Sequence, residues 1–89
     1  MYSIQYSTQF KKDFKKLRKL PIGDLKIVFE IITKLEKAVP LEVKFRDHDL
    51  HGNYKGFREC HIKPDLLLIY KVRDTELMLA RVGSHSELF

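Results

Sequence analysis

The sequence predicts an α+β fold: an N-terminal strand and a helical hairpin, then a three-strand antiparallel meander, with the helices packed on one face of a small sheet. Two observations predict this order. Apolar residues recur at helical spacing between residues 8 and 39, and they alternate or run together as in strands from residue 55 onward. Eighty-nine residues provide one modest core, so we expect a single domain over residues 1–89.

Composition and charge restrict the class of protein. Apolar residues make up 44% of the chain and charged residues 33%, which excludes a disordered chain. The longest apolar run, residues 66–70, is too short to cross a bilayer, and the N-terminus does not resemble a secretory signal. We therefore expect a cytoplasmic protein with no membrane partner. Cys60 is the only cysteine, which excludes an internal disulfide, and the net charge of +5 favours an anionic partner.

A change in apolar spacing marks the first strand and the first helix. Residues 2–6 alternate and predict a strand, and Ser7 or Thr8 is the candidate N-cap of a helix of about a dozen residues. Lys11 and Lys15 belong to a basic stripe on the exposed side of this helix. Like charges at this spacing destabilise a helix slightly. The stripe is either a solvated face or a surface for RNA or an acidic partner, and we assign Lys11 and Lys15 to substrate binding.

The second helix and the loop after it follow from turn residues. Residues 20–24 contain proline, glycine and aspartate, which predicts a turn with Asp24 as the candidate cap of a helix over residues 25–39. Pro40 ends that helix. In residues 41–55 the apolar side chains follow neither helical nor strand spacing. The segment is long for a connector, and it carries two histidines. Loops of this length are commonly functional, so we expect an ordered functional loop here.

The C-terminal part of the chain predicts three strands, at residues 55–61, 66–72 and 76–83. The middle one is apolar on both faces, so we expect it to be the central strand, covered by the helices on one side. Alternation places Glu59 and His61 on the same face. Pro64 cannot donate a hydrogen bond to a neighbouring strand, which places Asp65 in the hairpin turn. Residues 83–89 form a short tail.

Residues suited to acid–base chemistry gather in this half of the chain. Cleavage of RNA without a metal needs a base for the ribose 2′-hydroxyl, an acid for the departing 5′-oxygen, and cations for the phosphate. Histidine suits the first two roles and arginine the third, and an aromatic ring can stack on a nucleobase. The candidates are His48 and His51 in the loop, Glu59, His61 and Asp65 in the first hairpin, Arg81 in the last strand, and His85 and Phe89 in the tail.

Four segments together resemble the YafQ branch of the RelE/ParE superfamily, the toxins of bacterial type II toxin–antitoxin modules. They are residues 47–52, residues 57–65, the apolar run ending at Tyr70, and residues 81–89. The resemblance covers the whole chain in order and implies a toxin that cleaves mRNA on the ribosome and is neutralised by a cognate antitoxin. It places functional positions at His48, His61, Asp65, Arg81, His85 and Phe89, with Glu59 at the acidic position before the middle histidine.

The resemblance and the chemistry lead to one assignment of roles. They make His85 the general acid, His48 or Asp65 the base, His61 and Arg81 the groups that stabilise the phosphate, and Phe89 and Glu59 part of substrate binding. We expect no metal or other cofactor, an acidic antitoxin, and a monomer when free of it. Two alternatives stay open: a ParE-like non-enzymatic inhibitor of a protein such as gyrase, and a zinc site built from His48, His51, His61 and His85.

Overall fold

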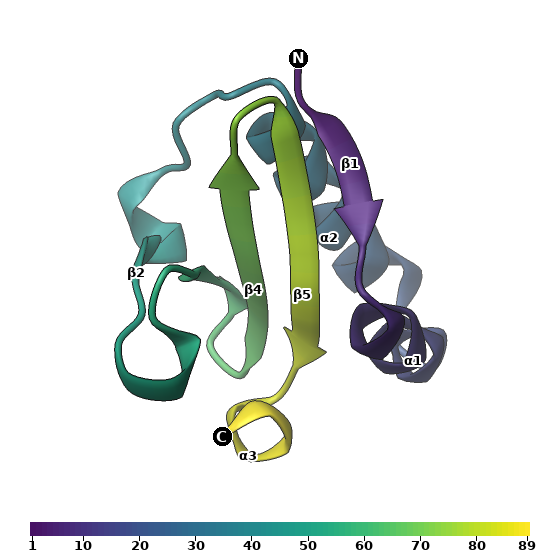
Figure 1. Ribbon diagram of the computed structural model, residues 1–89. Coiled ribbons are helices and arrows are strands. Elements are labelled where there is room, and N and C mark those ends of the chain that lie inside the picture. Colours follow the sequence, from purple (N-terminus) through teal and green to yellow (C-terminus); the bar gives the residue numbers. More distant parts are fainter.

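The computed structural model describes residues 1–89 and contains three α-helices, two short 3-10 helices (η) and five strands (Figure 1). The elements are β1 (Ser3–Tyr6), α1 (Thr8–Leu17), α2 (Ile22–Glu36), η1 (Val43–Phe45), β2 (His48–Asp49), η2 (Gly52–Tyr54), β3 (Arg58–Lys63), β4 (Leu66–Arg73), β5 (Glu76–Gly83) and α3 (His85–Leu88). The predicted α+β class is confirmed. None of the helices combines the length and the apolar character that a membrane crossing requires.

The strands form one mixed sheet in the order β1-β5-β4-β3-β2. β3, β4 and β5 form the predicted antiparallel meander with β4 at its centre, and β1 joins the edge of β5 in parallel. The prediction that residues 41–55 are only a loop was wrong in one respect, because His48 and Asp49 form β2 on the outer edge of β3. A two-residue strand is too short to give an alternating pattern, so the sequence contained no signal for it.

Both helices begin and end for identifiable reasons. Ser7 caps α1 as predicted, because its hydroxyl oxygen accepts a hydrogen bond of 2.9 Å from the amide of Phe10. α2 starts directly after Pro21, so Asp24 lies in the first turn of the helix. The prediction that Asp24 caps this helix was therefore wrong. The helix also ends at Glu36, earlier than predicted, and Ala38 takes the left-handed conformation (φ 58°) common after a helix end.

The two faces of the sheet are covered unequally. Figure 1 shows both long helices on one side, where side chains such as Ile31, Leu68 and Leu79 belong to a large buried cluster. On the other face a much smaller cluster contains Leu67 and Ile69 of β4 together with Leu88 of α3. β4 is therefore buried on both faces, as its sequence predicted. The second face carries no long helix, which leaves room for a site.

The two ends of the meander differ from the sequence prediction. β3 starts at Arg58 rather than at Lys55, because residues 52–54 form η2 and Gly56 (φ 94°) turns the chain in the left-handed region. The expected tail is ordered as the short helix α3. Ser84 and Glu87 form a reciprocal capping box at its start, which satisfies two backbone amides of a helix too short to stabilise itself.

Candidate active site

The strand register aligns four residues in one row across the open face. His48 in β2 lies opposite Glu59 in β3, Glu59 opposite Ile69 in β4, and Ile69 opposite Arg81 in β5. Residues directly opposite each other on neighbouring strands project to the same face. Three strand spacings separate the backbones of His48 and Arg81, about 14 Å at about 4.8 Å per spacing. The row therefore brings a histidine, a carboxylate and an arginine to one face, over the apolar floor of Leu67 and Ile69.

One end of the row is a histidine–glutamate cluster formed by His48, Glu59 and His61. Glu59 is 4% exposed, and its Oε1 atom lies 3.6 Å from Nε2 of His48 and 3.1 Å from Nε2 of His61. Nδ1 of His48 lies 2.6 Å from the backbone oxygen of Arg46. A carbonyl oxygen only accepts, so Nδ1 of His48 carries the proton. In the neutral ring, Nε2 is then the atom that can take up another proton.

The same cluster is the group of side chains best arranged for a metal. One ligand atom from each of its three residues lies within 4.8 Å of the others, and two imidazoles with one carboxylate suit Zn²⁺ or Cu²⁺. The four-histidine zinc site considered from the sequence is not formed. His48 and His61 do approach each other, but His51 is exposed at the start of η2 and His85 belongs to α3.

Residues around the cluster fix β2 on the sheet. Asp47 accepts hydrogen bonds from the Tyr70 hydroxyl (2.6 Å) and from Nε of Arg58 (3.3 Å). Burial, and then the hydrogen bond to Asp47, raise the pKa of Tyr70 above its ordinary value, so this hydroxyl remains a donor. Burial also raises the pKa of Cys60 to about 12. Cys60 is thus a protonated core residue and not a nucleophile.

The C-terminal cluster lies at the end of β5 and consists of Tyr54, Asp65, His85 and Phe89. Oδ1 of Asp65 accepts a hydrogen bond of 2.9 Å from the backbone amide of His85. The rings of His85 and Phe89 lie 5.0 Å apart at 34°, and Tyr54 meets Phe89 edge-on at 5.4 Å. The Tyr54 hydroxyl also donates to the backbone oxygen of Leu88 at 3.3 Å. Asp65 and Tyr54 therefore hold α3, and through it the side chain of His85.

A β-bulge brings Arg81 to the open face. Ile69 pairs with Arg81 but Tyr70 pairs with Leu79, which leaves Ala80 as an extra residue. Strict alternation from Leu79, which is buried under the helices, would have turned Arg81 into the core. The bulge shifts the pattern by one residue and turns Arg81 outward, as bulges near functional sites often do. Sequence alone gave no sign of this shift.

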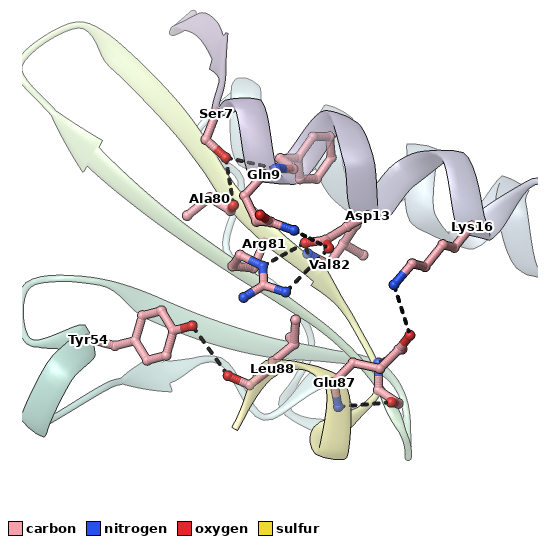
Figure 2. A network of polar contacts seen from close by, with 12 residues as sticks. Ser7, Gln9, Asp13, Lys16, Tyr54, Ala80, Arg81, Val82, Glu87 and Leu88 are labelled. Carbon is pink, nitrogen blue, oxygen red and sulfur yellow. Dashed lines mark hydrogen bonds and ion pairs between the residues drawn. The ribbon is translucent and has the colours of Figure 1, made fainter.

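Arg81 is paired with an acidic residue that the sequence analysis missed. Asp13 of α1 is 5% exposed and accepts from Nε of Arg81 at 2.7 Å (Figure 2). Asp13 follows Phe10 and precedes Leu17 on the apolar face of α1, at helical spacing. An acidic residue on an apolar helix face needs a partner in the fold, and this position was the signal available in the sequence.

The predicted substrate-binding lysines lie elsewhere. Lys11 and Lys15 border an apolar groove of about 360 Å³ formed by α1 and α2, away from the row on the open face. Five apolar side chains line this groove, Tyr6, Phe10, Phe14, Phe29 and Ile32, and Arg18 joins the two lysines at its border. Phe29 is 53% exposed. An apolar floor with a basic border is a surface suited to an acidic, amphipathic protein segment.

Comparison with known proteins gives consistent matches over nearly the whole chain. Residues 2–89 match the family model described as "Bacterial toxin of type II toxin-antitoxin system, YafQ". The chain is 37% identical over 86 residues to the mRNA interferase toxin YafQ of Escherichia coli, covering 97% of this chain and 94% of that protein.

Two solved structures are similar over their full length. A metal-bound toxin from Helicobacter pylori is 47% identical, covers 100% of both chains and superposes with a TM-score of 0.90. YafQ in the DinJ–YafQ complex of E. coli is 36% identical, with 100% of this chain and 99% of that chain covered and a TM-score of 0.81.

Proposed function

Because the chain belongs to the YafQ family of bacterial type II toxin–antitoxin toxins, we propose that it is an mRNA interferase that cleaves mRNA on the ribosome and so inhibits translation. Residues 1–89 act as one toxin domain in this proposal. The observation that carries it is the placement of His48, Glu59 and Arg81 in one row of the open face. A ParE-like inhibitor that only binds its target would have no use for these acid–base groups.

The proposed reaction begins at the histidine–glutamate cluster. His48 is the exposed member, so its Nε2 atom is the group that accepts the proton of the ribose 2′-hydroxyl. The 2′-oxygen then forms a bond to the phosphorus as the bond from phosphorus to the 5′-oxygen breaks. Glu59, buried between the two histidines, contacts the Nε2 atoms of both and so fixes the positions of their rings. The products are a 2′,3′-cyclic phosphate and a 5′-hydroxyl.

The C-terminal cluster supplies the acid, and Arg81 at the other end of the row supplies the cation. His85 donates a proton to the departing 5′-oxygen, and Phe89 beside it stacks on the adjoining base. Arg81 binds the phosphate through the nitrogen that it does not use for Asp13, and His61 assists from β3. Asp65 accepts a hydrogen bond from the His85 amide, which favours a role in positioning α3 over the role of general base that the sequence suggested for it.

Neutralisation by an antitoxin is the second part of the proposal. YafQ of E. coli occurs in a complex with DinJ, and this chain resembles that YafQ over its full length. We place an acidic, amphipathic antitoxin segment in the groove between α1 and α2, where Phe29 offers an exposed apolar contact and Lys11 and Lys15 offer charge. In the absence of the antitoxin the toxin is a monomer.

Metal binding at the histidine–glutamate cluster would oppose this reaction. The similar toxin from H. pylori is named as metal-bound, and His48, Glu59 and His61 provide a suitable set of donors in this chain. A bound ion would occupy the Nε2 atoms of both histidines and keep His48 from accepting a proton. We propose that such a metal acts as an inhibitor of this toxin.

The chemical ends of the cleaved RNA test the proposed reaction. Purified toxin is mixed with ribosomes carrying a defined mRNA at constant magnesium, and the same mRNA is tested without ribosomes. We expect rapid cleavage only on the ribosome, with 5′-hydroxyl and cyclic phosphate ends. Fragments with 5′-phosphate ends would indicate attack by water and exclude the proposed mechanism. Growth arrest without any RNA cleavage, together with inhibition of gyrase, would instead support the ParE-like alternative.

A further inference from the structure

The buried carboxylate of Asp13 has no part in the reaction proposed above, yet three of its four hydrogen bonds come from β5. Its Oδ2 atom accepts from Nε of Arg81 at 2.7 Å and from the backbone amide of Val82 at 3.2 Å. Its Oδ1 atom accepts from Nη2 of Arg81 at 3.3 Å and from the side-chain amide of Gln9 at 3.2 Å. Both oxygens thus accept from β5, and Oδ1 also accepts from Gln9 of α1, so Asp13 cannot move without breaking several hydrogen bonds.

Beyond the end of β1, side chains at and within α1 hydrogen-bond the free edge of β5. β1 ends at Tyr6, level with Leu79, and the Ser7 hydroxyl then donates to the backbone oxygen of Ala80 at 2.7 Å. Asp13 accepts from the backbone amide of Val82, two residues further along β5. Asp13 therefore binds β5 just beyond the bulge that turns Arg81 to the open face. Figure 2 shows that Ser7, the N-cap of α1, and Asp13 within α1 both approach β5.

The pair also determines which part of the guanidinium points away from Asp13. Two hydrogen bonds from neighbouring nitrogens fix the plane of an arginine side chain that would otherwise sample several rotamers. Figure 2 shows the remaining nitrogen, Nη1, pointing away from Asp13, toward the side where Tyr54 and α3 lie. Burial raises the pKa of Asp13, but the hydrogen bonds from Arg81, Gln9 and Val82 outweigh it and lower this pKa below its ordinary value. The carboxylate is charged, and Arg81 has a permanent counter-ion.

We propose that Asp13 is a positioning residue for RNA cleavage, which holds Arg81 so that Nη1 of its guanidinium faces the scissile phosphate. The inference rests on the proposed function, because it takes the phosphate as the partner of Arg81. A merely structural pair would join α1 to β5 and nothing more. A positioning pair must in addition act on the reaction through Arg81, and only through Arg81.

A double-mutant cycle separates these two roles. Asp13→Asn, Arg81→Ala and the double variant are compared in single-turnover cleavage of ribosome-bound mRNA, with thermal unfolding measured in parallel. Asn keeps the size of Asp13 but not its charge, and displacement of Arg81 should lower the rate at saturation by about 10²-fold, with the half-saturating concentration unchanged. In the Arg81→Ala background, Asp13→Asn should cause no further loss of rate.

Asp24→Asn is the matched control, because Asp24 also joins a helix to the sheet, through a 2.7 Å contact with Lys63, but touches none of the proposed reacting groups. It should cleave at the wild-type rate. If Asp13→Asn does not fold, Gln9→Ala takes its place, because it removes one hydrogen-bond donor to Asp13 and leaves the ion pair intact. Gln9→Ala should lower the cleavage rate less than Asp13→Asn, and it should cause no further loss of rate in the Arg81→Ala background. The inference would be overturned if Asp13→Asn lowered the cleavage rate by the same factor in the wild-type and Arg81→Ala backgrounds, or if Asp13→Asn cleaved at the wild-type rate. A wild-type toxin that does not cleave ribosome-bound mRNA would overturn the proposed function instead.

Discussion

The histidine–glutamate cluster and the C-terminal cluster hold their histidines in different ways. His48 and His61 project from paired strands, and the buried carboxylate of Glu59 contacts both rings. His85 lies on a helix of four residues, held by a capping box and by contacts from Asp65 and Tyr54. Backbone pairing fixes the first group, whereas a few side chains fix the second. The difference indicates that the proposed base, His48, keeps its position as long as the sheet is folded. The proposed acid, His85, can leave its position when α3 loosens, without unfolding of the chain.

Removal of the acid itself should have the largest effect. In His85→Ala the ring that donates the proton is lost, while the backbone contacts of α3 remain. We expect the rate of cleavage on the ribosome to fall by about 10²–10⁴-fold, the usual contribution of one acid–base group, with no change in thermal stability. His51→Ala is the matched control, because His51 is an exposed histidine outside both clusters, and it should cleave normally. Wild-type cleavage by His85→Ala would remove His85 from the mechanism.

Metal ions should act on the first cluster alone. Copper or zinc added at constant magnesium should bind His48, Glu59 and His61 and inhibit the wild-type toxin. Isothermal calorimetry should find the affinity lowered by about tenfold or more in Glu59→Gln, which lacks the charged donor, and unchanged in His85→Ala. Equal affinity for Glu59→Gln and the wild type would place the metal elsewhere, and activation by the metal would contradict its proposed inhibitory role.

Two variants of Asp65 distinguish a positioning residue from a base. Asp65→Ala removes the acceptor of the His85 amide. The loss of one such hydrogen bond at the start of a helix costs about 1 kcal/mol, which lowers the population of folded α3 by about fivefold. Asp65→Asn keeps an oxygen at the same place, so it should retain most of the wild-type cleavage rate. If Asn and Ala both lower the rate by about 10²-fold or more, Asp65 acts by its charge and the role of base returns to it.

Most of the fold could be predicted from the sequence, because helical spacing, alternation and turn residues are local signals. The central position of β4 and the shared face of Glu59 and His61 follow from such signals. The position of Arg81 does not, because the bulge at Ala80 depends on how β4 and β5 pair in the folded sheet. The contacts of Asp13 were hidden for a related reason. An acidic residue on an apolar helix face shows that it needs a partner, but not which residue that partner is.

The smallest expected effect comes from acid, and it acts on α3 first. The hydrogen bond from the backbone amide of Ser84, followed by the one from its side chain, lowers the pKa of Glu87 below its ordinary value of 4.5. A carboxyl group whose pKa is lowered by folding stabilises the folded state at every pH above its ordinary pKa. This stabilisation is lost as the pH falls through the folded-state pKa. The side chain of Glu87 is 46% exposed, so the effect is a loosening of α3 and not an unfolding of the chain.

Hydrogen exchange of single amides can detect this loosening. As the pH falls below about 4.5, the Leu88 and Phe89 amides should lose protection, after correction for the intrinsic rate, while those of β4 keep theirs, because backbone hydrogen bonds between strands do not titrate. In Glu87→Gln the charge that depends on pH is absent, so α3 should be less protected at neutral pH and should change little with acid. Parallel loss of protection in α3 and β4 would mean that the short helix is as firmly held as the sheet, and the contrast between the two clusters would then fail.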